Sequence, residues 1–214
     1  MPALERFELL RPLGRGGYGI VFEAMDRERG ERVAVKQLHR VSQRALASCK
    51  REFRTLSTLD HPGLPKLHDL FVRDEDWFFS MELVDGEDLA VHEAGGGEPS
   101  VTDGPSELPA VPLRRTIPDD AAAHVDDLLR RLLVVLDAIH GAGFVHCDVK
   151  PSNVRLRRDG QPILLDFGLA RALSDSAEPF TGTLAYAAPE QLRGVVSPAC
   201  DLYALGSLAF ELLN

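Results

Sequence analysis

The sequence predicts an α+β fold, in which a strand-rich first part is followed by a mainly helical second part. The first third contains short β-rich runs separated by turn residues: FELLRPLG, IVFEAMD and ERVAVKQL. Further along, residues 125–139 carry apolar side chains at three-and-four spacing, which is typical of an amphipathic helix closed by Gly141 and Gly143. A last segment, 201–213, is apolar nearly all the way round, which predicts a fully buried helix.

The remaining segments predict further parts of this architecture. Residues 42–59 have helical spacing and end before the helix-stopping HPG, and WFFSMEL follows a loop and predicts another strand. Residues 94–118 are dense in Gly, Pro, Ser and acidic residues and predict a solvated, mobile insertion. Because the chain ends directly after an apolar helix, it is expected to be a fragment that exposes apolar surface and depends on residues beyond Asn214.

Composition excludes several classes of function. The chain has 214 residues and a net charge of −9, which argues against nucleic acid as the main partner. No stretch approaches the ~18 uninterrupted apolar residues of a membrane helix, and the first residues do not form a secretory signal. The three cysteines are far apart and form no metal-type pair. A cytoplasmic protein with reduced thiols is therefore expected.

A glycine motif lies between the first two predicted strands, in the sequence GRGGYGIV. Because a strand runs in and a strand runs out, the motif does not fit the dinucleotide-binding fold, in which a helix follows. A hairpin tip without side chains allows backbone N–H groups to approach phosphates. A simple flexible hairpin also explains the glycines. The candidate nucleotide-binding residues here are Gly14, Gly16, Gly17, Gly19 and Val21.

The third predicted strand contains VAVK, with Ala34 and Lys36 on one face and Val33 and Val35 on the other. A small residue beside a lysine suits a flat ring next to a phosphate chain, although an edge lysine in solvent is the alternative. Glu52, in the middle of the following helix, can pair with Lys36 if that helix packs beside the sheet.

The densest set of polar residues is FVHCDVKPSN, residues 144–153. Asp148, Lys150 and Asn153 offer a proton acceptor, a cation and an oxygen ligand on one loop. Downstream, Asp166 begins the sequence DFG after the apolar run PILL, so a second carboxylate is expected at a strand end. With Asn153, this carboxylate could bind a hard cation such as Mg²⁺.

In this order, these motifs resemble the signature of the eukaryotic-like protein kinases, together with Ala188-Pro189-Glu190 and Asp201 in the last helix. The resemblance covers the chain except the 94–118 insertion. The residues within the motifs are most similar to those of bacterial Ser/Thr kinases. It implies a two-lobe fold: an antiparallel sheet with one helix over 1–84, and an incomplete, mainly helical lobe over 85–214.

The resemblance also implies roles. Lys36, paired with Glu52, would hold the α- and β-phosphates of ATP, and Asp148 would accept or orient the substrate hydroxyl proton. Lys150 would steady the γ-phosphate, and Asp201 would satisfy backbone donors around His146. Asn153 and Asp166 would hold Mg²⁺, with Mn²⁺ also possible. The nucleotide contacts would come from Ala34, Met81 as gatekeeper, Glu82 and Val84 in the hinge, and Asp88 near the ribose.

Lys150 and Thr183 resemble the Ser/Thr-specific branch, so the expected partners are ATP, protein substrates with Ser or Thr, and further C-terminal domains. Cys147 replaces the family's usual arginine, which grips an activation-loop phosphate. The protein is therefore expected not to need phosphorylation of that loop. Arg155 stands where the family has an apolar residue beneath the adenine, and it could stack on the ring or weaken nucleotide binding. A nucleotide-binding pseudokinase or scaffold is the alternative to an active kinase.

Overall fold

The computed structural model describes residues 6–16, 19–38, 50, 53–73, 76–89, 119–166, 171–172 and 182–214. The chain divides into two compact units, Met1–Asp85 (unit 1) and Gly86–Asn214 (unit 2). The strand-rich and helix-rich parts predicted from the sequence correspond to these units. The expected insertion at 94–118 and most of the helix expected over 42–59 lie outside the described residues.

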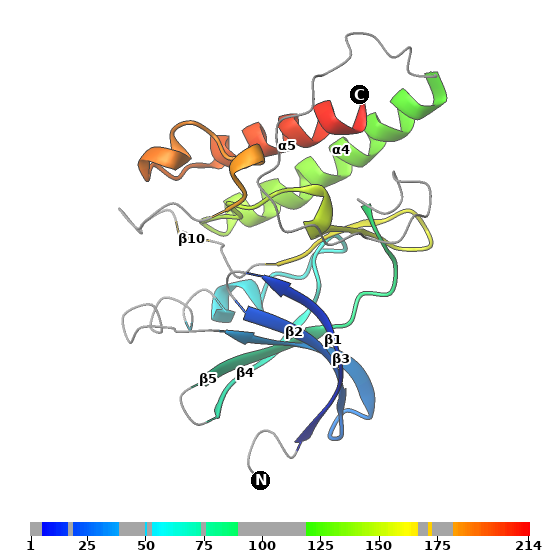
Figure 1. Ribbon diagram of the computed structural model, residues 1–214, viewed down its shortest axis with the longest axis vertical. Helices are drawn as coiled ribbons and strands as arrows, with labels where there is room; N and C mark the ends of the chain where they lie inside the picture. The colour runs from blue at the N-terminus through cyan, green and yellow to red at the C-terminus, as the bar shows by residue number, and fades with distance from the viewer. Residues whose placement is uncertain are drawn as a thin grey trace. The chain divides into compact units, whose positions relative to one another are not determined.

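Unit 1 is built on a five-stranded antiparallel sheet (Figure 1). The strands are β1 (Phe7–Gly16), β2 (Gly19–Asp26), β3 (Glu31–Leu38), β4 (Leu67–Arg73) and β5 (Asp76–Glu82), in the spatial order β1-β2-β3-β5-β4. Four of these strands confirm the sequence prediction. The reading of residues 67–73 as part of a loop is wrong, because this segment pairs along β5 from Leu67 to Arg73. Its run LHDLFVR contained the strand signal in its apolar residues.

The two faces of this sheet follow the alternation predicted for VAVK. Val33 and Val35 pack with Phe7, Ala24 and Phe78 in one buried cluster. Ala34 and Leu38 pack with Phe79 and Met81 in a second cluster, which is joined by the partly buried Val21 and Leu67. Because successive strand residues point to opposite faces, a one-residue change of register would exchange these sets.

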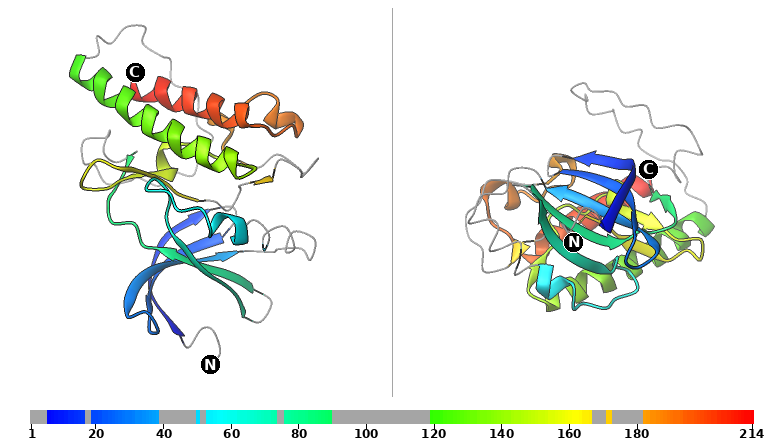
Figure 2. Two further views of the ribbon diagram at one scale, coloured as in Figure 1. Left: turned by 180° about the vertical axis from the view of Figure 1, so that it is seen from behind. Right: turned by 90° about the horizontal axis from the view of Figure 1, so that it is seen from below.

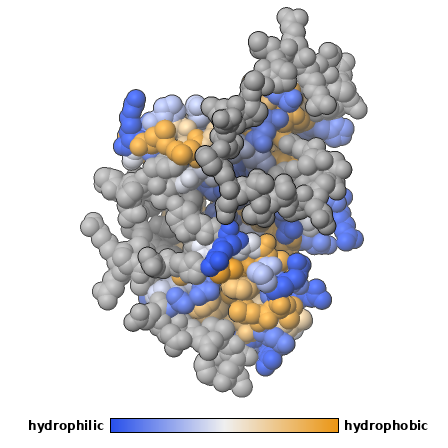
Figure 3. All heavy atoms as spheres, in the orientation of Figure 1, coloured by the Kyte–Doolittle hydropathy of each residue, from blue (hydrophilic) through white to orange (hydrophobic). Residues whose placement is uncertain are grey.

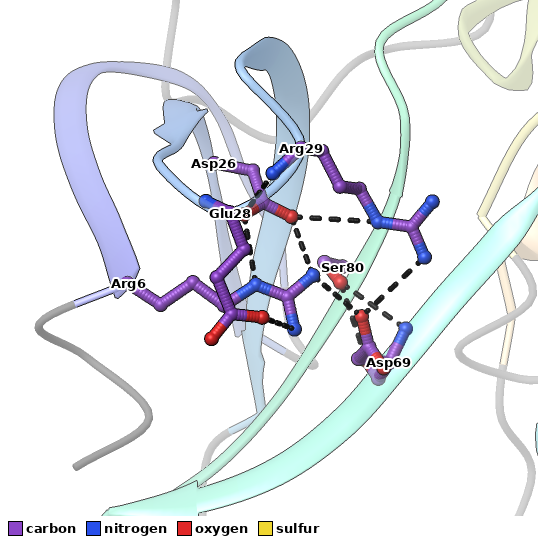
Figure 4. Close-up of polar contacts among 6 residues, drawn as sticks. All are labelled: Arg6, Asp26, Glu28, Arg29, Asp69 and Ser80. Carbon is purple, nitrogen blue, oxygen red and sulfur yellow. Dashed lines mark hydrogen bonds and ion pairs between the residues drawn. The ribbon is translucent and has the colours of Figure 1, made fainter. Parts of the chain in front are cut away.

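An ionic network connects Arg6, which precedes β1, with the last residue of β2 and with Asp69 near the start of β4 (Figure 4). The Asp26 carboxylate has no exposed surface and accepts two hydrogen bonds from the Arg6 guanidinium, at 2.8 and 2.6 Å. The same guanidinium donates to Asp69 on β4 at 2.9 Å. The backbone N–H groups of Glu28 and Arg29 also donate to Asp26, which closes the β2–β3 turn around it. The hydrogen bonds from Arg6 lower the pKa of Asp26, so this carboxylate stays ionised.

In the described part of unit 2, the helices α4 (Asp119–Gly141) and α5 (Pro198–Leu212) run side by side and antiparallel (Figures 1 and 2). Leu132, Leu136 and Ile139 on α4 are buried, as the sequence pattern predicts, and Val135, which lies off that predicted face, is buried too. Leu133, which the pattern includes, is 42% exposed, so the prediction is wrong at this position. Leu208 on α5 is fully buried as well.

Short elements connect the helices. Strand β7 (Phe144–Val145) pairs with β10 (Arg171–Ala172), and β6 (Glu87–Asp88), β8 (Val154–Leu156) and β9 (Pro162–Leu164) form a three-stranded sheet. The described residues also form the 3-10 turns η1 (Pro151–Asn153), η3 (Leu184–Tyr186) and η4 (Gln191–Arg193).

The prediction that 201–213 is fully buried is wrong for the described residues. Cys200, Asp201, Ala204, Leu205 and Leu208 form the buried side of α5. Leu202, Tyr203 and Phe210 on the same helix are 48–57% exposed. Hydrophobic surface is visible in both units in the space-filling view (Figure 3). In the part of the chain that the structure describes, no helix has both the length and the apolar character needed to span a bilayer.

Candidate active site

The glycine motif of unit 1 forms the tip of the β1–β2 hairpin, where Gly16 lies opposite Gly19. Gly19 has a φ of +152°, and a Cβ at this position would lie 1.8 Å from the carbonyl oxygen of Gln37 on β3. Only glycine permits this approach of two backbones. Around a Cβ built on Gly14, by contrast, the described residues place no atom within 4 Å, so its backbone is open. Gly17 lies outside the described residues.

The expected nucleotide-site side chains of unit 1 lie on one face of its sheet. Val21 on β2 is directly opposite Lys36 on β3, and Ala34 is opposite Met81 on β5. Ala34 and Met81 share one buried cluster with Val21 at its edge, and Lys36 is 3% exposed. A buried lysine requires charge or hydrogen-bond partners, and Lys36 does interact with neighbouring groups. Glu52, its expected partner, lies outside the described residues.

The expected hinge residues follow directly along the chain. The Glu82 backbone N–H donates to the Lys66 carbonyl at 2.8 Å, and Val84 is 5% exposed. These contacts hold the end of β5 against the segment that precedes β4.

In unit 2 the Asp148 carboxylate is the centre of a polar network and is 7% exposed. Lys150 Nζ lies 2.8 Å from one carboxylate oxygen, and the Thr183 hydroxyl donates to the other at 2.8 Å. Lys150 also donates to Thr183 at 2.7 Å. The Asn153 side-chain amide donates both to the Asp148 carbonyl, at 2.8 Å, and to its carboxylate, at 3.0 Å. The structure therefore brings Asp148, Lys150 and Asn153 together, and it adds Thr183 from 33 residues beyond Lys150.

Asp201, on α5, binds the backbone at the start of this loop. Its carboxylate has no exposed surface and accepts the backbone N–H groups of His146 and Cys147, each at 2.8 Å. Cys147 has a φ of 67°, a left-handed conformation that costs free energy for a residue other than glycine. The two hydrogen bonds offset that cost. The role that the resemblance implied for Asp201 is thus present in the structure.

His140 completes the environment of Asp201, with its ring Nε2 2.8 Å from the carboxylate. Sequence reasoning missed His140, because nothing in the pattern relates the last turn of α4 to a residue 61 positions later. It also missed Gln191, whose side-chain amide donates to the Cys147 carbonyl at 2.8 Å. Both contacts depend on how α4, α5 and η4 pack.

The His146 ring connects the loop to the strand that precedes Asp166. Its Nδ1 accepts the Asp148 backbone N–H at 3.3 Å, and its Nε2 lies 2.9 Å from the Leu165 carbonyl. An acceptor at Nδ1 and a carbonyl at Nε2 fit the neutral ring that carries its proton on Nε2. In this form the ring holds the backbone on both sides of the site.

Asn153 and Asp166 lie at the same end of the β8–β9 hairpin. The Leu165 backbone N–H donates to the Asn153 carbonyl at 2.7 Å, and Asp166 has a left-handed backbone with a φ of 65°. The Asn153 side-chain nitrogen is bound to Asp148, so the side-chain atom left for a cation is its amide oxygen. An amide oxygen and a carboxylate are ligands that suit a hard divalent cation. The rest of the DFG motif, residues 167–168, lies outside the described residues.

The last pair of expected nucleotide-site residues also meets in unit 2. Asp88 on β6 lies directly opposite Arg155 on β8, and Arg155 Nε is 3.2 Å from an Asp88 carboxylate oxygen.

These features define the class of protein. A model of the protein kinase domain family matches residues 7–214, and the chain belongs to that family. Its relatives include a Streptomyces coelicolor protein named as a probable serine/threonine-protein kinase, which is 36% identical over 98% of this chain and 30% of its own length. The serine/threonine-protein kinases PknA of Mycobacterium tuberculosis and pkn2 of Myxococcus xanthus are 34% and 35% identical, again over 98% of this chain. The chain spans 47% of PknA and 24% of pkn2, so it corresponds to less than half of these relatives.

Proposed function

We propose that this chain is the catalytic domain of a protein serine/threonine kinase, which transfers the γ-phosphate of ATP to Ser or Thr hydroxyls of proteins. In this proposal, residues 1–84 are the N-terminal lobe and residues 85–214 are part of the C-terminal lobe. The observation that carries the proposal is the Asp148 carboxylate, which is nearly buried and held by Lys150, Thr183 and Asn153. The names of the relatives support the Ser/Thr class.

Asp148 would orient the substrate hydroxyl and accept its proton. Its carboxylate is positioned before the substrate arrives, because three side chains fix its two oxygens. Lys150, beside it, would stabilise the negative charge on the phosphoryl group during transfer. Most of the rate gain would then come from positioning and electrostatic stabilisation, as is general for phosphoryl transfer.

On the nucleotide side, Lys36 and Glu52 would hold the α- and β-phosphates beneath the glycine hairpin. Val21, Ala34 and Met81 would enclose the adenine, and the backbone of Glu82 and Val84 would bind its edge. Asn153 and Asp166 would hold Mg²⁺, or Mn²⁺, which supplies positive charge that neutralises the phosphates. Both side chains offer oxygen donors at the same end of one hairpin.

A nucleotide-binding pseudokinase or scaffold is the second candidate, favoured by Cys147 and Arg155 at two positions where the family has other residues. The two candidates differ in whether phosphate is transferred. In the full-length protein with radiolabelled ATP and Mg²⁺, transfer to Ser or Thr is expected, and Asp148→Asn should lower it by about 10³-fold or more.

Asp159→Asn is the matched control, because this carboxylate lies in the exposed β8–β9 turn and should leave the rate unchanged. Nucleotide binding without any transfer in the wild type would decide for the pseudokinase. For the whole protein, we propose a cytoplasmic location, protein substrates as partners, and additional domains C-terminal to this chain.

A further inference from the structure

The short sheet β6-β8-β9 in unit 2 brings Asp88 and Arg155 face to face. Gly86, just before β6, lies so close to β8 that a Cβ there would be 2.3 Å from the Leu156 carbonyl oxygen. Glu87 then pairs with Leu156, and Asp88 with Arg155. Residues directly opposite in an antiparallel pair project from the same face. The strand register therefore places the Asp88 carboxylate and the Arg155 guanidinium on the same face of the sheet.

The contact between them orients Asp88 and leaves it able to bind. Arg155 Nε is buried and lies 3.2 Å from Asp88 Oδ1, at the distance of an ion pair but without the alignment of a hydrogen bond. The Asp88 side chain is 46% exposed and that of Arg155 only 27%. An ionised carboxylate has about four acceptor sites on its two oxygens. The exposed part of the Asp88 carboxylate can therefore accept hydrogen bonds from a ligand. The less exposed Arg155 guanidinium restricts the position of this carboxylate.

A carboxylate that only accepts hydrogen bonds selects ligands that carry donors. On a nucleoside triphosphate whose base edge is directed elsewhere, the hydrogen-bond donors that suit a single carboxylate are the ribose hydroxyls. Holding the carboxylate in place before the ligand arrives reduces the side-chain entropy lost on binding. An apolar residue at position 155 would offer Asp88 no such partner.

We propose that Arg155 is a positioning residue that makes this domain discriminate ribose hydroxyls through Asp88. The inference rests on the proposed function, because it assumes that the nucleotide binds with its ribose at Asp88. It replaces the two possibilities that the sequence left open, stacking on the adenine and simple weakening of binding, with a third role. The cation acts on the nucleotide through its ion-pair partner.

The experiment compares ATP with 2′,3′-dideoxy-ATP, which lacks both hydroxyls, as phosphate donors for the full-length protein. A site that hydrogen-bonds a substrate hydroxyl rejects the analogue that lacks it. Arg155→Leu should lower the preference for ATP, measured as the ratio of kcat/KM values, by about tenfold. The change should appear mainly as a higher KM for ATP with little change in kcat, because binding is lost equally in the ground and transition states.

Four further variants complete the experiment. Asp88→Ala should abolish the preference, and adding Arg155→Leu to it should change the ratio no further. Arg155→Lys should retain part of the preference, since it keeps the charge, and it replaces Arg155→Leu if that variant does not fold. Arg158→Leu removes an exposed arginine from the same sheet's turn and should leave the ratio as in the wild type.

Three results would overturn the inference. If Arg155→Leu changes KM equally for both nucleotides, Arg155 acts on the base or the phosphates and not through Asp88. If Arg155→Leu changes neither KM value while the wild type binds ATP and transfers phosphate, this inference fails and the proposed function stands. A wild type that neither binds ATP nor transfers phosphate would defeat both.

Discussion

Asp26 in unit 1 and Asp201 in unit 2 are both carboxylates without exposed surface, but different donors stabilise them. Asp26 is bound by a charged guanidinium, which also reaches Asp69 on another strand. Asp201 is bound by two backbone N–H groups and the ring of His140. The first arrangement joins strands, and the second holds Cys147 in its left-handed backbone conformation.

This difference shows why the two regions should respond differently to substitution. Arg6 has further acidic partners in Asp69 and Glu28, so part of its network survives the loss of Asp26. The backbone N–H groups of His146 and Cys147 have no comparable substitute among the described contacts, because each is directed at Asp201. A buried donor that loses its acceptor keeps the full cost of desolvation.

The largest effect is expected for Asp201→Asn. The amide nitrogen would face a backbone N–H, and the charge that strengthens both hydrogen bonds would be lost, so the free energy of unfolding should fall by about 4 kcal/mol. Urea unfolding of the full-length protein measures this change, and hydrogen exchange should accelerate at the Cys147 amide. Asp126→Asn, an exposed carboxylate paired with Arg130 on α4, is the control, with a change of about 0.5 kcal/mol or less.

A smaller effect is expected for Asp26→Asn, about 2 kcal/mol, because Arg6 is partly exposed and keeps its other partners. The hydrogen bonds from Arg6 lower the pKa of Asp26, so this stabilisation is present at neutral pH and is lost as the pH falls through the folded-state pKa. The stability difference between wild type and Asp26→Asn should therefore shrink between pH 7 and pH 3, as measured by urea unfolding.

Glu8→Gln is the control for unit 1, since Glu8 and its partner Arg27 are both more than half exposed. Its effect should be near zero across the same pH range. A difference for Asp26→Asn that stays constant with pH, or that exceeds the effect of Asp201→Asn, would contradict the comparison.

The smallest effect is expected from removing phosphate from the activation segment. In unit 2 a thiol, Cys147, stands beside the Asp201 anchor, and it cannot grip a phosphate as a guanidinium does. Phosphatase treatment of the wild type, verified by mass spectrometry, should change the phosphotransfer rate by no more than about twofold. A large loss on dephosphorylation alone would refute this prediction.

Phosphatase treatment is a cleaner test than a variant of Thr183. The Thr183 hydroxyl already binds Asp148 and Lys150, so Thr183→Val would disturb the site without any change in phosphorylation. Thr181 lies outside the described residues, and Thr181→Val provides the second arm of the test.

Much of this molecule follows from local patterns. Alternation placed β1, β2, β3 and β5, and helical spacing placed α4, because each period directs one set of side chains to one face. Asp148, Lys150 and Asn153 share one loop, so their proximity follows from their spacing. The alternation-based reading missed β4, and it overstated the burial of α5, because hydrophobicity alone does not say how much of a helix another element covers.

The amino-acid sequence by itself determined the order of strands and helices, the glycine hairpin and the polar loop at 146–153, since these depend on residues close together in the chain. Only the tertiary structure decided the pairings of Asp201 with His140, of Asp26 with Arg6 and Asp69, and of Asp88 with Arg155. Those partners are separated by many residues. The packing of helices and the register of strands, which no local period encodes, select them.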